Sequence, residues 1–185
     1  MKHAKRLVLT TTAVATAAAG LFLGTTAGNA GATEPASAAA AVKAPAAPAA
    51  LAVPDGNKLT GVFAAHGVQT YTCTDGAWKF LEPAATLSDK RGRTVALHSR
   101  GPVWVSTVDG SAVNASAIAN SPKTGTIPEL LLQATATRGT GAFADVSYIQ
   151  RLNTTGGVAP TTACTGTEQV GVQYTATYAF YKPAK

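Results

Sequence analysis

His98 is the side chain of this sequence best placed for chemistry, because it ends a predicted strand and precedes a short loop that holds Arg100 and Trp104. A neutral imidazole in that position could act as a general base or bind a ligand. The alternative is a strand-end histidine that only hydrogen-bonds to the backbone. His66 lies beside Gly67, between two predicted strands, and is interpreted as a turn residue.

The sequence holds no complete signature of a catalytic or metal site. It has no G-x-S-x-G elbow for a serine nucleophile, and Asp109-Gly110-Ser111 is better explained as a turn. His66 and His98 are far apart, with no carboxylate at short spacing, so no metal site is predicted. The dinucleotide fingerprint G-x-G-x-x-G is missing as well, and no cofactor is expected.

The N-terminus predicts export from the cytoplasm. Three basic residues stand within the first six positions, and residues 7–33 carry no charge. The apolar part of this run passes into Ala30-Gly31-Ala32, a pattern of small residues that signal peptidases cleave. We therefore predict a signal peptide at residues 1–32 and a secreted protein of the extracellular space or cell envelope. A retained transmembrane anchor is the alternative, but the threonines and Gly20 make this run a weak membrane span.

Removal of this leader lowers the positive charge of the chain. Three of the fifteen Lys and Arg residues lie in it and all nine Asp and Glu residues lie beyond it, so the remainder carries a net charge of +3. This charge does not predict nucleic-acid binding. One basic stretch could bind phosphate or an acidic polysaccharide, whereas a solvated loop is the alternative. Its members are Lys90, Arg91, Arg93 and Arg100.

The only two cysteines, Cys73 and Cys164, both lie in the part predicted to be exported, where oxidising conditions preserve disulfides. We predict that they pair. A closed loop of about a hundred residues could stabilise the fold by up to about 4 to 5 kcal/mol in the chain-entropy model. A redox pair or metal ligands are the alternatives, although the sequence has no C-x-x-C and no histidine at ligand spacing.

Residues 33–52 consist mostly of alanine and proline and cannot form a hydrophobic core. Because proline-rich linkers stay extended, we predict a disordered tether. Residues 53–185 are then a single β-rich domain, which is long enough for one core and is expected to be a monomer. No stable membrane span is expected once the leader is cleaved.

The clearest element is the segment 170–180, in which apolar side chains alternate with small or polar ones. Such alternation predicts a strand with one face on a core. Seven shorter segments show the same tendency: 59–65, 67–73, 78–81, 93–98, 103–108, 130–137 and 144–152. Turn signals such as Asp75-Gly76 separate most of them. The pattern predicts an all-β or β-dominated domain, an antiparallel sandwich or barrel with one disulfide, with helix competing only at 111–120 and 129–134.

A set of residues spread over this domain resembles one family. The set contains Gly67-Val68-Gln69, Tyr71, Cys73, Trp78, Phe80, Asp89, Gly92, His98, Gly101-Pro102, Trp104, Asp109-Gly110-Ser111, Ile127-Pro128, Leu130-Leu131-Leu132, Tyr148-Ile149-Gln150-Arg151, Asn153-Thr154, Gly156-Gly157, Ala159-Pro160, Cys164 and Tyr178 to Tyr181. Together these residues resemble the uncharacterised exported family of bacteria and fungi known as domain of unknown function number 3455. The resemblance covers about residues 53–181. The chain departs from the family pattern at Glu129, where the family has tryptophan.

The resemblance implies a Cys73–Cys164 pair but no reaction, because the family has no established one. It also implies one group of polar and aromatic residues that propensity alone would not select. These candidates for ligand binding are His98, Trp104, Arg151 and Asn153.

These observations lead us to expect a binding or interaction module of the cell envelope or extracellular space, with a small molecule or an envelope polymer as ligand. The expectation rests on the leader, the disulfide, the aromatic and arginine side chains near loops, and the incomplete catalytic signatures. One alternative is a small hydrolase or oxidoreductase that uses His98 with Arg151 or Asp109. Another is a structural envelope or stress-protective protein without a small ligand.

Overall fold

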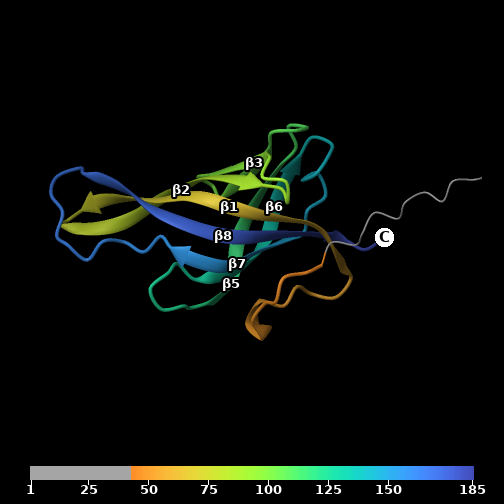
Figure 1. The fold of residues 1–185 in the computed structure, drawn as a ribbon, viewed down its shortest axis with the longest axis horizontal. Coiled ribbons are helices and arrows are strands. Elements are labelled where there is room, and N and C mark those ends of the chain that lie inside the picture. Colours follow the sequence, from red (N-terminus) through yellow and green to blue (C-terminus); the bar gives the residue numbers. More distant parts are fainter. Residues whose placement is uncertain (1–42) are drawn as a thin grey trace, which may run out of the picture. The chain divides into compact units, whose positions relative to one another are not determined.

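The computed structural model describes residues 43–185, which form eight antiparallel strands. Each strand pairs with the next one along the chain, and β8 pairs with β1, so the sheet closes into a barrel (Figure 1). The strands are β1 (Asn57–Thr74), β2 (Ala77–Ser88), β3 (Thr94–Ser99), β4 (Val103–Ser106), β5 (Ala112–Ser121), β6 (Glu129–Arg138), β7 (Tyr148–Gly156) and β8 (Gln169–Pro183). The predicted all-β fold is confirmed, and of the two architectures expected it is the barrel.

The predicted signal peptide, and the predicted tether as far as residue 42, lie outside the described residues. None of the helical segments in residues 43–185 is long and apolar enough to cross a membrane.

The longest strands, β1 and β8, close the barrel along a register that runs from Asn57 opposite Pro183 to Thr72 opposite Gln169. The inward face of β8 is buried, as the alternation in the sequence predicted, at Tyr174, Ala176, Tyr178 and Phe180. At one end β1, β2 and β8 extend together beyond the shorter strands (Figure 1).

The prediction of a turn at His66 is wrong, because His66 and Gly67 lie inside the continuous strand β1. The glycine has a packing role rather than a turn role. A Cβ atom at Gly67 would overlap the carbonyl oxygen of Ala84 and the Cα of Ala85 on the neighbouring strand. Only glycine permits this close approach of two backbones inside a sheet.

The helix considered for residues 111–120 and 129–134 is also wrong, since these segments form β5 and β6. Each is paired on both sides, and this pairing outweighs the weak strand preference of alanine, serine and asparagine. The last short segment was predicted to begin at residue 144, but β7 begins at Tyr148. The residues before it form a loop from which Phe143 and Val146 enter the core.

The barrel interior is filled at the end where β6 runs into β7. Phe143 from this loop stacks on Phe180, with ring centroids 4.7 Å apart, and Trp104 meets Phe180 edge-on at 6.2 Å. These rings are almost fully buried. The space that remains inside the barrel therefore lies toward the opposite end.

A second, smaller cluster lies on the outside of the barrel. Leu51, in the short 3-10 helix η1 (Ala49–Leu51), is fully buried against Leu131 and Leu152. The Gln150 side chain donates a hydrogen bond to the Leu51 carbonyl at 2.6 Å. The last residues of the segment predicted to be a tether therefore pack on the barrel wall.

The predicted disulfide between Cys73 and Cys164 is confirmed. It joins the end of β1 to the connection between β7 and β8, and the Cys73 amide also donates to the Glu168 carbonyl at 2.8 Å. Both sulfur-bearing residues are buried. The disulfide thus fixes the β7–β8 connection to the extended end of the barrel.

Candidate functional site

A pocket of about 560 Å³ occupies the barrel on the side away from the Phe143 plug. Its wall comes from all eight strands or the connections next to them, on the side where β1 leads to β2, β3 to β4 and β5 to β6. Aromatic and aliphatic side chains predominate. The lining residues are Gln69, Tyr71, Phe80, Leu81, Pro83, His98, Arg100, Gly101, Pro102, Trp104, Ala117, Ile127, Pro128, Leu130, Leu132, Arg151 and Tyr178.

The deepest part of the wall is a cluster of three rings. His98 and Trp104 are directly opposite each other on β3 and β4, and their rings stack with centroids 4.2 Å apart and planes 5° from parallel. Tyr178 meets both rings edge-on at 5.4 Å. All three side chains are at most 3% exposed. The strands hold these rings rigidly, so the wall is formed before any ligand arrives.

His98 is neutral and its tautomer follows from its contacts. Its Nδ1 lies 3.0 Å from the Val103 carbonyl, which can only accept, so Nδ1 carries the proton and Nε2 is left as an acceptor. Burial lowers the pKa of His98 to about 4, the bond to Val103 raises it, and the positive charge of Arg151 lowers it further. The imidazole is therefore uncharged at neutral pH, where it can accept a proton only weakly.

Arg151 supplies the charge inside the pocket. It is half-buried on β7, directly opposite Tyr178 on β8. Its Nε and Nη2 donate to the Pro128 carbonyl at 3.2 and 2.9 Å. A guanidinium has five N–H groups, so this contact leaves donors for a further acceptor. The residues that line the pocket within the described part of the chain include no Asp or Glu.

Three buried donors in the pocket wall make no hydrogen bond with any of residues 43–185. They are the Gln69 Nε2, the Trp104 Nε1 and the Tyr178 hydroxyl. Buried polar groups are nearly always paired in folded proteins, and leaving one unpaired costs roughly 1 to 3 kcal/mol. Burial also raises the pKa of the Tyr178 hydroxyl, with Arg151 opposing, so it stays a donor. Three such donors on residues that line one cavity indicate that an acceptor belongs beside them.

The basic stretch predicted from the sequence is divided between the two ends of the barrel. Arg93 bonds to Asp89 at 2.7 Å beside the β2–β3 connection. Arg100 lines the pocket mouth, where its Nε contacts the Glu82 Oε2 at 2.9 Å. Both pairs are solvent-exposed on the arginine side. The charge of Arg100 is therefore already matched, whereas Arg151 has no acidic partner within residues 43–185.

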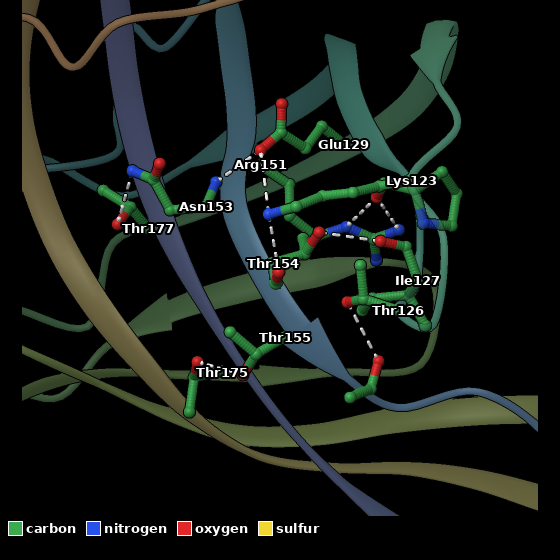
Figure 2. Close-up of polar contacts among 12 residues, drawn as sticks. Lys123, Thr126, Ile127, Glu129, Arg151, Asn153, Thr154, Thr155, Thr175 and Thr177 are labelled. Atoms are coloured by element: carbon green, nitrogen blue, oxygen red, sulfur yellow. Dashed lines mark hydrogen bonds and ion pairs between the residues drawn. The ribbon is translucent and has the colours of Figure 1, made fainter.

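The structure brings three of the four ligand-binding candidates, His98, Trp104 and Arg151, to this one pocket. It does not bring Asn153 there. Asn153 has a left-handed backbone with φ of 50°, its Nδ2 donates to the Thr177 hydroxyl at 3.4 Å, and its backbone amide donates to Glu129 at 2.8 Å (Figure 2). Glu129, the residue that departs from the family pattern, thus secures the exposed side of β7.

Asp109 lies in the β4–β5 connection, at the opposite end of the barrel from the pocket, so the structure does not pair it with His98. Its carboxylate accepts hydrogen bonds from the Ser111 amide and hydroxyl and from the Ala142 amide. These bonds hold the pKa of Asp109 well below its usual range, the Ser111 hydroxyl contributing most. Asp109 therefore fastens two loops to each other, which agrees with its interpretation as a turn residue.

The sequence reasoning missed Gln69 and assigned Tyr178 only to a core strand. A signal for Gln69 was present, because it stands between Gly67 and Tyr71 at an inward position of an otherwise apolar alternation in β1. A polar side chain at such a position is buried and needs a partner. Tyr178 belongs to the set of residues that resembles the family and Tyr174 does not, but the alternation alone treats both as core residues. Tyr174 is also buried but does not line the pocket.

Within residues 43–185 no three His, Cys, Asp or Glu side chains come together in a way that could hold a metal ion. A family model described as "Protein of unknown function (DUF3455)" matches residues 54–182, which span nearly the whole barrel. This match confirms the resemblance seen in the sequence. No curated protein and no solved structure matches the chain.

Proposed function

The chain belongs to the DUF3455 family, and we propose that this member is a binding protein whose barrel holds one small organic molecule. The observation that carries the proposal is the 560 Å³ pocket together with the three unpaired donors in its wall. Ligand sites typically measure about 300 to 1,000 Å³ and combine an apolar lining with a few polar groups. An eight-stranded barrel is just wide enough either to be filled by side chains or to hold one small ligand.

The chemistry of the lining supports binding better than catalysis. None of the lining residues in the described part of the chain is a Ser, Thr, Cys, Asp or Glu that could serve as nucleophile or acid. Among the described residues that line the pocket, His98 is the only histidine, and burial lowers its pKa to about 4. A general base works best with a pKa near the operating pH. The enzyme alternative used His98 with Arg151 or Asp109. Arg151 shares the pocket with His98 and Asp109 does not, but with either partner the low pKa of His98 gives general-base catalysis little support.

We also propose that the protein acts as a monomer in the extracellular space or cell envelope. The N-terminal sequence pattern supports export, and the buried Cys73–Cys164 disulfide is of a kind that persists in oxidising compartments. An envelope polymer is a less suitable ligand than a small molecule, because a pocket inside a barrel surrounds a compact group more readily than a chain. The structural role without ligand gives no reason for the unpaired donors.

Titration with N-phenyl-1-naphthylamine, a neutral fluorescent probe, tests the pocket. Ala117 lines the pocket, so Ala117→Trp places an indole there. The next residue, Ile118, is exposed, so Ile118→Trp places the same group on the outer surface. We expect saturable binding at one site in the wild type and in the Ile118 variant, and at least tenfold weaker binding in the Ala117 variant. Absent binding, or equal binding by both variants, would overturn the proposal.

A further inference from the structure

We infer that the natural ligand carries a single carboxylate, seated between the Arg151 guanidinium and the donors of Gln69, Trp104 and Tyr178. This inference deepens the proposed function and rests on it. It names the chemical class of the ligand: an organic acid with a largely apolar, flat body.

The first support is the unmatched charge of Arg151. The described residues show ion pairs for Arg93, Arg100 and Lys123, but none for Arg151, whose one acceptor is the neutral carbonyl of Pro128. A half-buried guanidinium is normally matched by an anion, because a charge in an apolar setting loses its hydration. Carboxylates are well suited to this task, since both oxygens lie in one plane with the guanidinium fork.

The second support is that the unpaired groups are donors. The Gln69 amide nitrogen and the Trp104 indole nitrogen can only donate, and the Tyr178 hydroxyl is protonated. They come from β1, β4 and β8, and Arg151 comes from β7. Tyr178 and Arg151 are directly opposite in the strand register. A ligand ammonium group has only N–H donors and would leave these groups without an acceptor, whereas a carboxylate offers about four lone-pair sites.

The third support is the balance of charge, which favours one negative charge over two. Arg100 at the mouth is matched by Glu82, and His98 is neutral, so Arg151 is the single free cation among the lining residues in the described part of the chain. A phosphate dianion would bring a second charge without a partner. The rest of the lining, with Tyr71, Phe80 and the His98–Trp104 stack, suits a flat aromatic or unsaturated body.

The test compares naphthalene-2-carboxylate with 2-naphthalenemethanol, which has the same body without the charge. Trp78→Phe leaves Trp104 as the only tryptophan, so quenching of its fluorescence reports on the pocket. We expect the carboxylate to bind at least tenfold tighter than the alcohol. Arg151→Gln should remove this difference while the alcohol binds as before.

A second variant guards against a loss of folding in the arginine variant. Tyr178→Phe removes only an unpaired hydroxyl and should weaken carboxylate binding at least threefold, with no effect on the alcohol. Tyr181→Phe is the control, since the Tyr181 hydroxyl donates to Gln150 and its ring does not line the pocket. Equal binding of alcohol and carboxylate to the wild type would overturn this inference and leave the proposed function standing. Binding of neither compound would count against both.

Discussion

The imidazole of His98 lies flat on the indole of Trp104, with ring centroids 4.2 Å apart and planes 5° from parallel. The two residues are cross-strand partners, so the β3–β4 hairpin fixes their separation. The Nδ1 proton of His98 is held by the Val103 carbonyl, which prevents the ring from rotating. The stack therefore fixes the orientation of the indole, whose N–H is among the unpaired donors of the described residues.

Acidification should destabilise the fold through His98. Burial lowers its pKa to about 4 in the folded state, whereas the unfolded value is about 6.5, so the unfolded chain binds the proton first as the pH falls. The neutral imidazole makes its full contribution to the free energy of unfolding above pH 6.5. This contribution is lost progressively as the pH falls from 6.5 to 4. The loss in the free energy of unfolding should reach up to about 3 kcal/mol.

Urea denaturation at several pH values measures this effect. His98→Asn keeps a donor toward Val103 but does not titrate, so its stability should fall less steeply between pH 6.5 and 4 than that of the wild type. His66→Gln is the control, because the His66 side chain is exposed on β1. Parallel curves for the wild type and the His98 variant would contradict the assignment of a buried neutral imidazole.

At two tyrosines near the pocket, loss of the hydroxyl should change the free energy of unfolding differently. The Tyr71 hydroxyl donates to the Gly157 carbonyl at 2.6 Å, so Tyr71→Phe should lower the free energy of unfolding by about 1 kcal/mol. The Tyr174 hydroxyl is buried without a partner in the described residues, so Tyr174→Phe should leave stability unchanged or raise it. Thermal unfolding of the two variants side by side checks this order, and the reverse order would refute it.

Removal of the disulfide should cost more than any of these changes. Cys73 and Cys164 are 91 residues apart, and the chain-entropy model gives up to about 4 to 5 kcal/mol for a loop of that size. We expect the double change to serine to lower the urea midpoint strongly, and reduction of the wild type with dithiothreitol to produce a similar shift. An unchanged midpoint in both would show that the β7–β8 connection is held by other contacts, such as the Cys73–Glu168 backbone bond.

The sequence was most informative where one periodicity decided the structure. The alternation over residues 170–180 predicted β8, because a strand with one buried face must alternate. The same reasoning failed at His66 and Gly67, since glycine signals a close approach of two strands as well as a turn. Strand pairing between residues far apart in the chain decides between these possibilities, and one sequence does not contain it.

The sequence likewise predicted the candidate site only in part. Arg151 and Asn153 are two positions apart, so a regular strand would direct both to the same face. The register of β7 shifts between Leu152 and Thr155, and Asn153 adopts a left-handed backbone there, which turns its side chain to the outside. A β-bulge of this kind has no clear sequence signal, so the resemblance singled out the correct segment without giving the direction of each side chain.

Pro83 has a consequence for how copies of this protein meet one another. Strand β2 pairs with β3 only from Ala85 to Ser88, so its outer edge from Ala77 to Ala84 is unpaired within the described residues. An open strand edge invites a second chain to extend the sheet, which is a common start of aggregation. Proline lacks the N–H that such an extension requires, and Lys79 adds a charge on the same strand. The barrel can thus expose a long hairpin beside its pocket and still remain a poor template for fibrils.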